Sequence, residues 1–295
     1  MRFWACNASV SQKMGRGMTV GVFFAVLGAA FLHALWNALI KTGASKQSAM
    51  VILGLCQALC GLGMAIWRGV PVPEAWIWLL GSGLIHMFYQ LFLSYAYEHG
   101  DLSRVYPIAR GAAPMIVLVI GAFALADHVT GVEVIGILIL GAGILLIARG
   151  VFTEGEQRKM LPFAFGSAVA TAGYTITDGM GARAAGDAVL YVGWLMMVSA
   201  VFYVPVALAI KGTIILRAPP RAWAFGLVAG ACSFGAYAIA VWAMTIAPIA
   251  VVAALRETSI LFAVLMGWLV FGEKMTRDKG LAAVIIVAGV ILTRL

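Results

Sequence analysis

Residues 110–127 read RGAAPMIVLVIGAFALAD, and residues 256–273 read RETSILFAVLMGWLVFGE. Each stretch opens on an arginine, continues through an apolar run and closes on an acidic residue. Adding 146 to each residue number superimposes the two stretches without a gap and extends as far as Leu146 on Leu292. Seven aligned pairs are identical: Arg110/Arg256, Gly121/Gly267, Thr130/Thr276, Ile139/Ile285, Ala142/Ala288, Gly143/Gly289 and Leu146/Leu292. An internal repeat of this length predicts that the fold is built twice from one unit.

The composition places the chain in a membrane. Of its 295 residues, 63% are hydrophobic and only 11% are charged, whereas soluble domains carry about 25% charged residues. The net charge of +8 is spread over short loops between apolar runs rather than gathered on one face. This distribution excludes a nucleic-acid-binding protein and makes the lipid bilayer the expected environment.

A bilayer core about 30 Å thick needs about 20 helical residues for one crossing, and ten segments of the chain meet this requirement approximately. They are residues 18–40, 47–67, 75–97, 104–125, 129–149, 161–183, 188–210, 222–246, 249–271 and 278–293. Each half then holds five spans, and an odd number obliges the second half to enter the membrane upside down. We therefore predict an all-α integral membrane protein with ten transmembrane helices arranged as two inverted five-helix repeats.

The predicted repeats occupy residues 18–150 and 160–295, on either side of the longest connection in the chain. Residues 1–17 form a more polar leader, for which Met14 or Met18 is an alternative start. Inverted repeats are typical of secondary transporters, which bind substrate near the midplane and work by alternating access.

Several stretches resemble one family. HALWNALIK at 33–41, DLSRVYPIARG at 101–111 and LRETS at 255–259 are similar to EamA-type members of the drug/metabolite transporter superfamily. The resemblance covers nearly the whole chain and implies two inverted five-helix repeats, a central cavity and transport of small metabolites. YTITDG at 174–179 is most similar to membrane proteins associated with phosphonate utilisation.

The orientation of the chain stays open at the sequence level. The resemblance implies that both termini are cytoplasmic, which would put six Lys and Arg residues in the inside positions and twelve in the outside loops. The positive-inside rule prefers the reverse arrangement.

Arg110 and Arg256 lie inside predicted spans, where a charge costs about 2.5–3.5 kcal/mol on insertion scales. Such residues are functional candidates, and the guanidinium fork suits a carboxylate, phosphate or phosphonate. The alternative for Arg256 is a structural ion pair with the neighbouring Glu257, whereas Arg110 has no acid nearby in its own span. Pro114 is expected to bend the fourth span, because it cannot donate to the carbonyl of Arg110.

Polar and aromatic side chains recur at helical spacing and predict wettable helix faces that point inward. Span one offers His33, Trp36 and Asn37, and span three offers His86, Tyr89 and Gln90. The predicted substrate-binding set consists of Arg110, Arg256, His33, Trp36, Asn37, Tyr89, Gln90, Tyr106, Tyr174 and Tyr237. Glu257 and Asp178 are the proton-coupling candidates, because a desolvated carboxylic acid can exchange protons with substrate or solvent.

These features predict a secondary transporter of a small organic anion or metabolite, such as an organophosphonate. The alternative on the same fold is an exporter of amino acids or of mixed metabolites and drugs. An intramembrane enzyme is disfavoured, because no nucleophile and base stand at usable spacing. No cofactor or metal is expected, and we interpret Cys6, Cys56, Cys60 and Cys232 as packing residues. We expect a multi-pass protein of the inner cell membrane that binds a small-molecule substrate and no nucleic acid, with a homodimer as one further expectation.

Overall fold

The computed structural model describes residues 18–40, 45–99, 110–125, 127–148, 158–269 and 275–294. Every regular element within these ranges is helical, which confirms the all-α part of the predicted fold class. The α-helices are α2 (Val20–Ile40), α3 (Lys46–Arg68), α4 (Trp76–His99), α6 (Ala113–Ala124), α7 (Gly131–Ala148), α9 (Leu161–Ala185), α10 (Ala188–Lys211), α11 (Pro220–Met244), α12 (Ile249–Arg256), α13 (Ser259–Leu269) and α14 (Arg277–Leu292). Short 3₁₀ turns lie at η1 (Pro73–Ala75), η2 (Arg158–Met160) and η3 (Thr213–Leu216).

The helices carry the marks of a multi-pass membrane protein. Within the described residues, six segments are long and apolar enough to cross a bilayer: Val20–Leu39, Gln47–Arg68, Pro73–Ala96, Ala188–Lys211, Pro220–Met244 and Ile249–Leu269. Two more apolar helices, α6 and α7, are shorter. Large apolar side chains also face outward, and Phe123 is 90% exposed, as expected where lipid is the solvent. A membrane protein is confirmed, whereas the count of ten spans stays a prediction.

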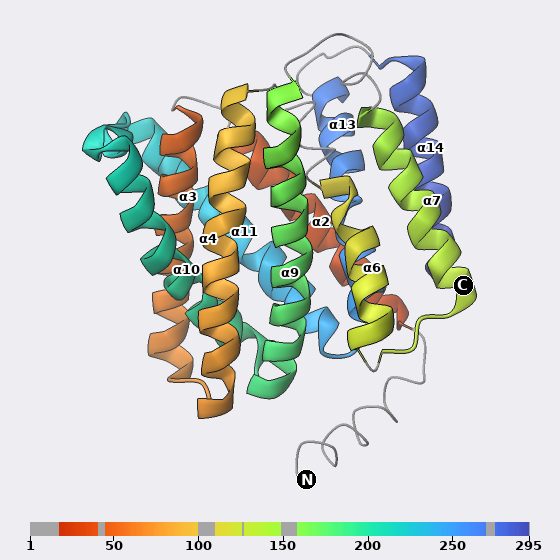
Figure 1. Ribbon diagram of the computed structural model, residues 1–295, viewed down its shortest axis with the longest axis horizontal. Coiled ribbons are helices and arrows are strands. Elements are labelled where there is room, and N and C mark those ends of the chain that lie inside the picture. The colour runs from red at the N-terminus through yellow and green to blue at the C-terminus, as the bar shows by residue number, and fades with distance from the viewer. Residues whose placement is uncertain are drawn as a thin grey trace.

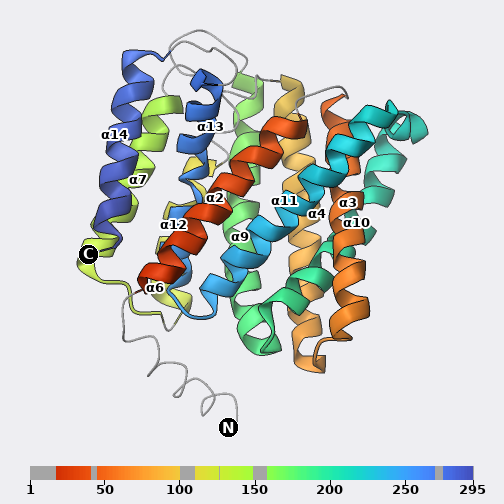
Figure 2. The same ribbon diagram turned by 180° about the vertical axis from the view of Figure 1, so that it is seen from behind.

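The chain direction alternates from one span to the next, with α12 and α13 running the same way as parts of one span (Figure 1). In that view α2, α4 and α7 run toward the top, and in the second half α9, α11 and α14 run toward the bottom. The reverse view shows α2 and α11 crossing side by side over the other helices (Figure 2). The second half of the chain therefore enters the bundle in the opposite sense to the first, as the sequence predicts.

The helix boundaries reproduce the offset found in the sequence. Helix α6 begins at Ala113 and α13 at Ser259, which differ by 146. Helix α7 begins at Gly131 and α14 at Arg277, which also differ by 146. The alignment of the two halves is thus confirmed as an alignment of structural elements.

Helices α7 and α14 pack against each other through the aligned glycines Gly143 and Gly289. A Cβ added to Gly289 would lie 2.8 Å from the carbonyl oxygen of Gly136, and a Cβ added to Gly143 would lie 3.1 Å from that of Ala282. Because 136 and 282 also differ by 146, these are the same contact made twice. The two repeats therefore meet here across a pseudo-two-fold axis.

The GxxxG pair of α11 predicts close helix packing, and the structure confirms it. A Cβ on Gly226 would lie 2.3 Å from the Ile52 side chain, and one on Gly230 would lie 2.6 Å from the Cβ of Cys56. Small residues thus bring α11 against α3. Cys56, Cys60 and Cys232 are free thiols, and Cys6 lies outside the described residues.

Two predicted spans differ from continuous helices. Span nine is divided into α12 and α13 by a turn at Glu257 and Thr258, where the Glu257 N–H bonds back only three residues, to the Ala254 carbonyl. In span four, Arg110 and Gly111 are helical, Ala112 forms a bend and α6 begins at Ala113, so the expected bend lies immediately before Pro114, which occupies the first turn of α6. A proline is accepted there because the first helical turn needs no N–H donor from it.

Candidate functional site

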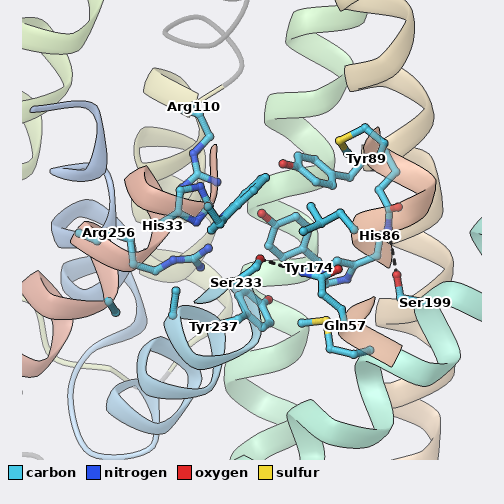
Figure 3. Close-up of a pocket in the computed structure, with 18 residues that line it drawn as sticks. His33, Gln57, His86, Tyr89, Arg110, Tyr174, Ser199, Ser233, Tyr237 and Arg256 are labelled. Atoms are coloured by element: carbon cyan, nitrogen blue, oxygen red, sulfur yellow. Dashed lines mark hydrogen bonds between the residues drawn. The ribbon is translucent and has the colours of Figure 1, made fainter. Parts of the chain in front are cut away.

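A polar cavity lies between the two halves of the chain, and helices α2, α3, α4 and α9 to α12 all contribute to it, together with Arg110. The space into which the centre of a water molecule fits is about 70 Å³. Since one water needs about 10–15 Å³ on this measure, the cavity can hold several waters or a small solute. Figure 3 shows both arginines reaching it from the side opposite His86 and Tyr89.

The structure brings most of the predicted substrate-binding set to this cavity. The members of the predicted set that line it are His33, Trp36, Tyr89, Gln90, Arg110, Tyr174, Tyr237 and Arg256. Asn37 does not line it, and its side-chain amide instead donates to the His33 carbonyl at 2.8 Å within α2. Tyr106 lies outside the described residues.

Arg110 and Glu257 form a buried ion pair across the repeat boundary. The Nε of Arg110 donates to Oε2 of Glu257 at 3.0 Å, and their side chains are 3% and 4% exposed. The expectation that Arg110 lacks a nearby acid holds only within its own span. The alternative pairing of Glu257 with Arg256 is wrong, because adjacent helical residues diverge and the acid turns toward the other repeat.

Arg256 is held in a different way. Its guanidinium carbon lies 5.0 Å from the centre of the Tyr237 ring, a cation–π contact. Among the described residues it makes no ion pair with a carboxylate within 4.0 Å. Its guanidinium points into the cavity (Figure 3). The charge of Arg256 is therefore available to a bound solute.

Asp178 lies fully buried in α9 behind the cavity wall. It accepts hydrogen bonds from the hydroxyls of Tyr191, at 3.0 Å, and Tyr237. Its Oδ2 is also 4.0 Å from Nε2 of His86. Asp178 thus belongs to a hydrogen-bonded network beneath the cavity.

His86 stands between this network and the cavity. Its ring stacks on Tyr174 with 4.1 Å between the ring centres, and it lines the cavity. Its Nδ1 is 3.0 Å from the Ser82 carbonyl oxygen. The chosen binding set omits His86, although its spacing of three and four residues from Tyr89 and Gln90 places it on their helix face.

Further polar groups of the cavity come from helices that the binding set does not use. Gln57 of α3 donates to Ser233 at 2.8 Å, and Gln90 donates to Ser199 of α10 at 3.1 Å. The partners lie more than 100 residues apart in the chain, so only the fold reveals them. The buried indole N–H of Trp36 makes no hydrogen bond within the part of the chain that the structure describes, and it remains available to a solute.

The cavity wall is cationic and hydrogen-bonding. None of the described residues that line it is a carboxylic acid. Glu257 lies behind Arg110 and Asp178 lies behind Tyr237 and His86. The described residues also contain no group of three or more His, Cys, Asp or Glu side chains that could hold a metal ion. The arrangement favours an anionic solute.

A second cross-repeat ion pair lies at the end of α6. Arg183 donates to both oxygens of Asp127, at 2.7 and 3.1 Å, and Nε donates to the Met244 carbonyl at 2.9 Å. Asp127 also accepts from the backbone N–H of Ile249, at the start of α12, at 2.8 Å. The sequence identifies Asp127 only as the acid that closes a repeated span, and gives no signal for its partner.

Fold and site together define a class: a multi-pass membrane protein built from two inverted repeats around a polar, arginine-bearing cavity. The EamA-like transporter family matches the chain twice, over residues 19–149 and 158–295. The chain belongs to this family, and it is a membrane transporter of the drug/metabolite transporter type; members of the family are transporters rather than enzymes. The match does not distinguish a phosphonate-associated subtype.

A solved crystal structure of another protein has the same fold. It superimposes with a TM-score of 0.71 and 16% sequence identity, over 93% of this chain and 98% of the other. At this identity the likeness extends to the fold alone. Comparison with curated proteins gives no match. The boundaries 18–150 and 160–295 stay a prediction about domains.

Proposed function

We propose that this protein carries a small organic anion across the inner cell membrane by alternating access, with Arg256 as the main anion-binding group. The single observation that carries the proposal is the state of Arg256. It is 6% exposed, points into the cavity, and has Tyr237 rather than a carboxylate against it. A desolvated cation without a carboxylate in direct contact is costly, and an anionic substrate supplies such a contact.

The other cavity residues suit the same ligand. The Nε of Arg110 already donates to Glu257. We therefore assign Arg110 a structural role, in which its ion pair holds this side of the cavity in place. Trp36 and His33 also line the cavity, with 5.0 Å between their ring centres. Their ring N–H groups are possible donors to the oxygens of an anion. An organophosphonate is the substrate that we propose to test first, because its tetrahedral oxygens match a guanidinium fork.

An exporter of amino acids is the competing function on this fold. A zwitterion needs an acceptor for its ammonium group beside the donor for its carboxylate. The described cavity wall presents no carboxylic acid, so the observations favour the anion. Glu257 and Asp178 remain the proposed proton-coupling acids, both reached through a side chain that lines the cavity.

The test uses purified protein in liposomes. Counterflow of labelled methylphosphonate, phosphate monoesters and neutral amino acids is measured for the wild type, Arg256→Gln and Arg277→Gln. Arg277 is an exposed arginine in the first turn of α14, so its variant controls for the loss of a positive charge. We expect methylphosphonate exchange that Arg256→Gln abolishes and Arg277→Gln leaves intact. Exchange of amino acids alone, or equal exchange by both variants, contradicts the proposal.

A further inference from the structure

His86 and Asp178 are two neighbouring side chains that could exchange a proton. They belong to the hydrogen-bonded network that includes Tyr237. His86 of α4 faces the cavity, and Asp178 of α9 lies 4.0 Å behind its Nε2. They come from helices that pack along their length. The pair is separate from the Arg110–Glu257 ion pair, which involves neither of these helices.

The geometry around His86 fits an imidazolium ion. Nδ1 lies 3.0 Å from the Ser82 carbonyl oxygen, which can only accept, and 3.1 Å from the Ser82 hydroxyl, which can accept or donate. We assign the ring hydrogen to Nδ1, where it reaches the carbonyl oxygen. The neutral ring then has a free lone pair on Nε2, and Nε2 is the atom that faces Asp178. A proton added to Nε2 would lie between the ring and a carboxylate, and both ring N–H groups would have an acceptor.

The groups around the pair come from five helices. The titratable or charged side chains that face His86 or Asp178 are Tyr89 of α4, Tyr174 of α9, Tyr191 of α10, Tyr237 of α11 and Arg256 of α12. The tyrosine hydroxyls that reach Asp178 donate to it and stay neutral. Arg256 is the group whose partner changes during transport, since we propose that it binds the anion.

We propose that the His86–Asp178 pair takes up one proton when the anion binds at Arg256, so that the protein is a proton–anion symporter. This inference rests on the proposed function. The proton leaves a hydronium ion or buffer acid in the cavity and forms an N–H bond at Nε2 of His86, and the carboxylate neutralises it. The pair changes from a net charge of −1 to zero, and this removes a negative charge beside the anion.

The coupling follows from electrostatic linkage. An anion at Arg256 is repelled by the unprotonated pair and not by the protonated one, so protonation tightens anion binding. Linkage is reciprocal, and the anion must therefore tighten proton binding by the same factor. Couplings of this kind are typically 5- to 150-fold. Histidine suits this purpose because an unperturbed imidazole changes its charge between about pH 5 and pH 8.

The experiment measures binding of methanesulfonate, whose own charge is constant over this pH range, to purified full-length protein in detergent. We expect the wild-type Kd to fall by about 5- to 150-fold from about pH 8 to about pH 5. His86→Gln keeps a side chain that can hydrogen-bond but cannot hold the proton, so its Kd should not vary with pH. His128→Gln alters an exposed histidine outside the cavity and should behave as the wild type does.

Asp178→Asn provides a second variant. It removes the negative charge permanently, so we expect a Kd near the low-pH value of the wild type at every pH. Wild-type pH dependence that survives in either His86→Gln or Asp178→Asn overturns the inference. If neither variant binds methanesulfonate, proton uptake by the wild type on adding the anion in weak buffer decides: about one proton per anion supports the inference, and none overturns it.

The two proposals fail in different ways. If the wild type binds methanesulfonate equally at every pH, only the symport inference is wrong. If the wild type binds neither methanesulfonate nor methylphosphonate at any pH, the proposed anion site itself is wrong.

Discussion

Arg110 and Arg256 occupy equivalent positions in the two repeats, but their charges are balanced differently. Arg110 is neutralised by Glu257, whereas the position aligned with Glu257 in the first repeat is Gly111. The second repeat therefore supplies the acid, Glu257, and the first repeat supplies the arginine that pairs with it, Arg110. This asymmetry leaves Arg256 with an aromatic ring as its neighbour and a cavity in front of it.

The Arg110–Glu257 pair predicts a specific pattern of stabilities. Arg110→Gln leaves a buried carboxylate without its cation, and breaking a buried pair in this way costs about 3–5 kcal/mol. Arg110→Gln/Glu257→Gln leaves two neutral side chains that can hydrogen-bond to each other, and should recover most of that loss. Thermal unfolding of the purified variants in detergent measures the difference. A double variant no more stable than Arg110→Gln would contradict a pairwise role.

Sequence reasoning locates these arginines but not their partners. A charge inside an apolar run is visible from the sequence alone, because its insertion cost marks it. The acid that satisfies Arg110 is 147 positions away, and no local spacing rule reaches it. For the same reason the network of Asp178, Tyr191 and His86 becomes apparent only when α4, α9 and α10 are placed together.

Tyr237 can be tested as the aromatic support of Arg256. Tyr237→Phe keeps the ring and loses only the hydroxyl that donates to Asp178, so methylphosphonate should still bind. Tyr237→Leu also removes the cation–π contact, which is worth about 0.5–2 kcal/mol. We expect its KM for methylphosphonate to rise by roughly 2- to 30-fold above that of the Phe variant, measured by uptake into liposomes. Equal KM values for the two variants would show that the ring does not position Arg256.

At the scale of elements, interrupted helices put both arginines at equivalent helix junctions. Arg256 is the last residue of α12, and Arg110 lies just before the start of α6. Discontinuous helices of this kind are typical of transporter sites. Pro114 marks the break in the first repeat, but the aligned residue in the second is Ile260. There the side chain of Thr258 bonds to the Leu255 carbonyl at 2.7 Å, a local competition with the helix that sequence periodicity does not reveal.

The contact between α7 and α14 gives a prediction about packing. Gly289→Ala would place a methyl group 2.6 Å from the Leu140 backbone nitrogen, and such overpacking typically costs about 1–3 kcal/mol. Gly280→Ala in the same helix meets nothing within 4 Å and should stabilise by about 0.5–1 kcal/mol. Thermal unfolding in detergent compares the two variants. If Gly289→Ala is as stable as Gly280→Ala, the close approach of the helices is not required.

At the scale of the whole molecule, the repeats are tied together by more than the cavity. The Asp127–Arg183 pair joins the end of α6, in the first repeat, to α9 and the α11–α12 turn, in the second. Inverted repeats achieve alternating access by moving against each other around a fixed site. In the alternating access that we propose for this protein, a link of this kind breaks when this end of the molecule opens.

Breaking the link by mutation should favour the open arrangement at that end. Asp127→Asn removes the carboxylate that both Arg183 and the Ile249 N–H use, so the α11–α12 turn loses its anchor. Ala247, in this turn, is 1% exposed, and a thiol introduced there by Ala247→Cys should react slowly with a maleimide in a background with the four native cysteines replaced by alanine. We expect Asp127→Asn to accelerate that reaction.

The control for local opening is a second buried position on one of the linked helices. Ala172 of α9 is 0% exposed, and a thiol at Ala172→Cys reports loosening of the bundle as a whole. If the Asp127–Arg183 pair holds this end of the molecule closed, Asp127→Asn accelerates labelling at position 247 and leaves labelling at position 172 slow, because only this end opens. Equal acceleration at both positions would mean that Asp127 stabilises the fold in general. In that case the movement of the repeats would have to be controlled elsewhere, and the buried Arg110–Glu257 pair is one further cross-repeat contact to test.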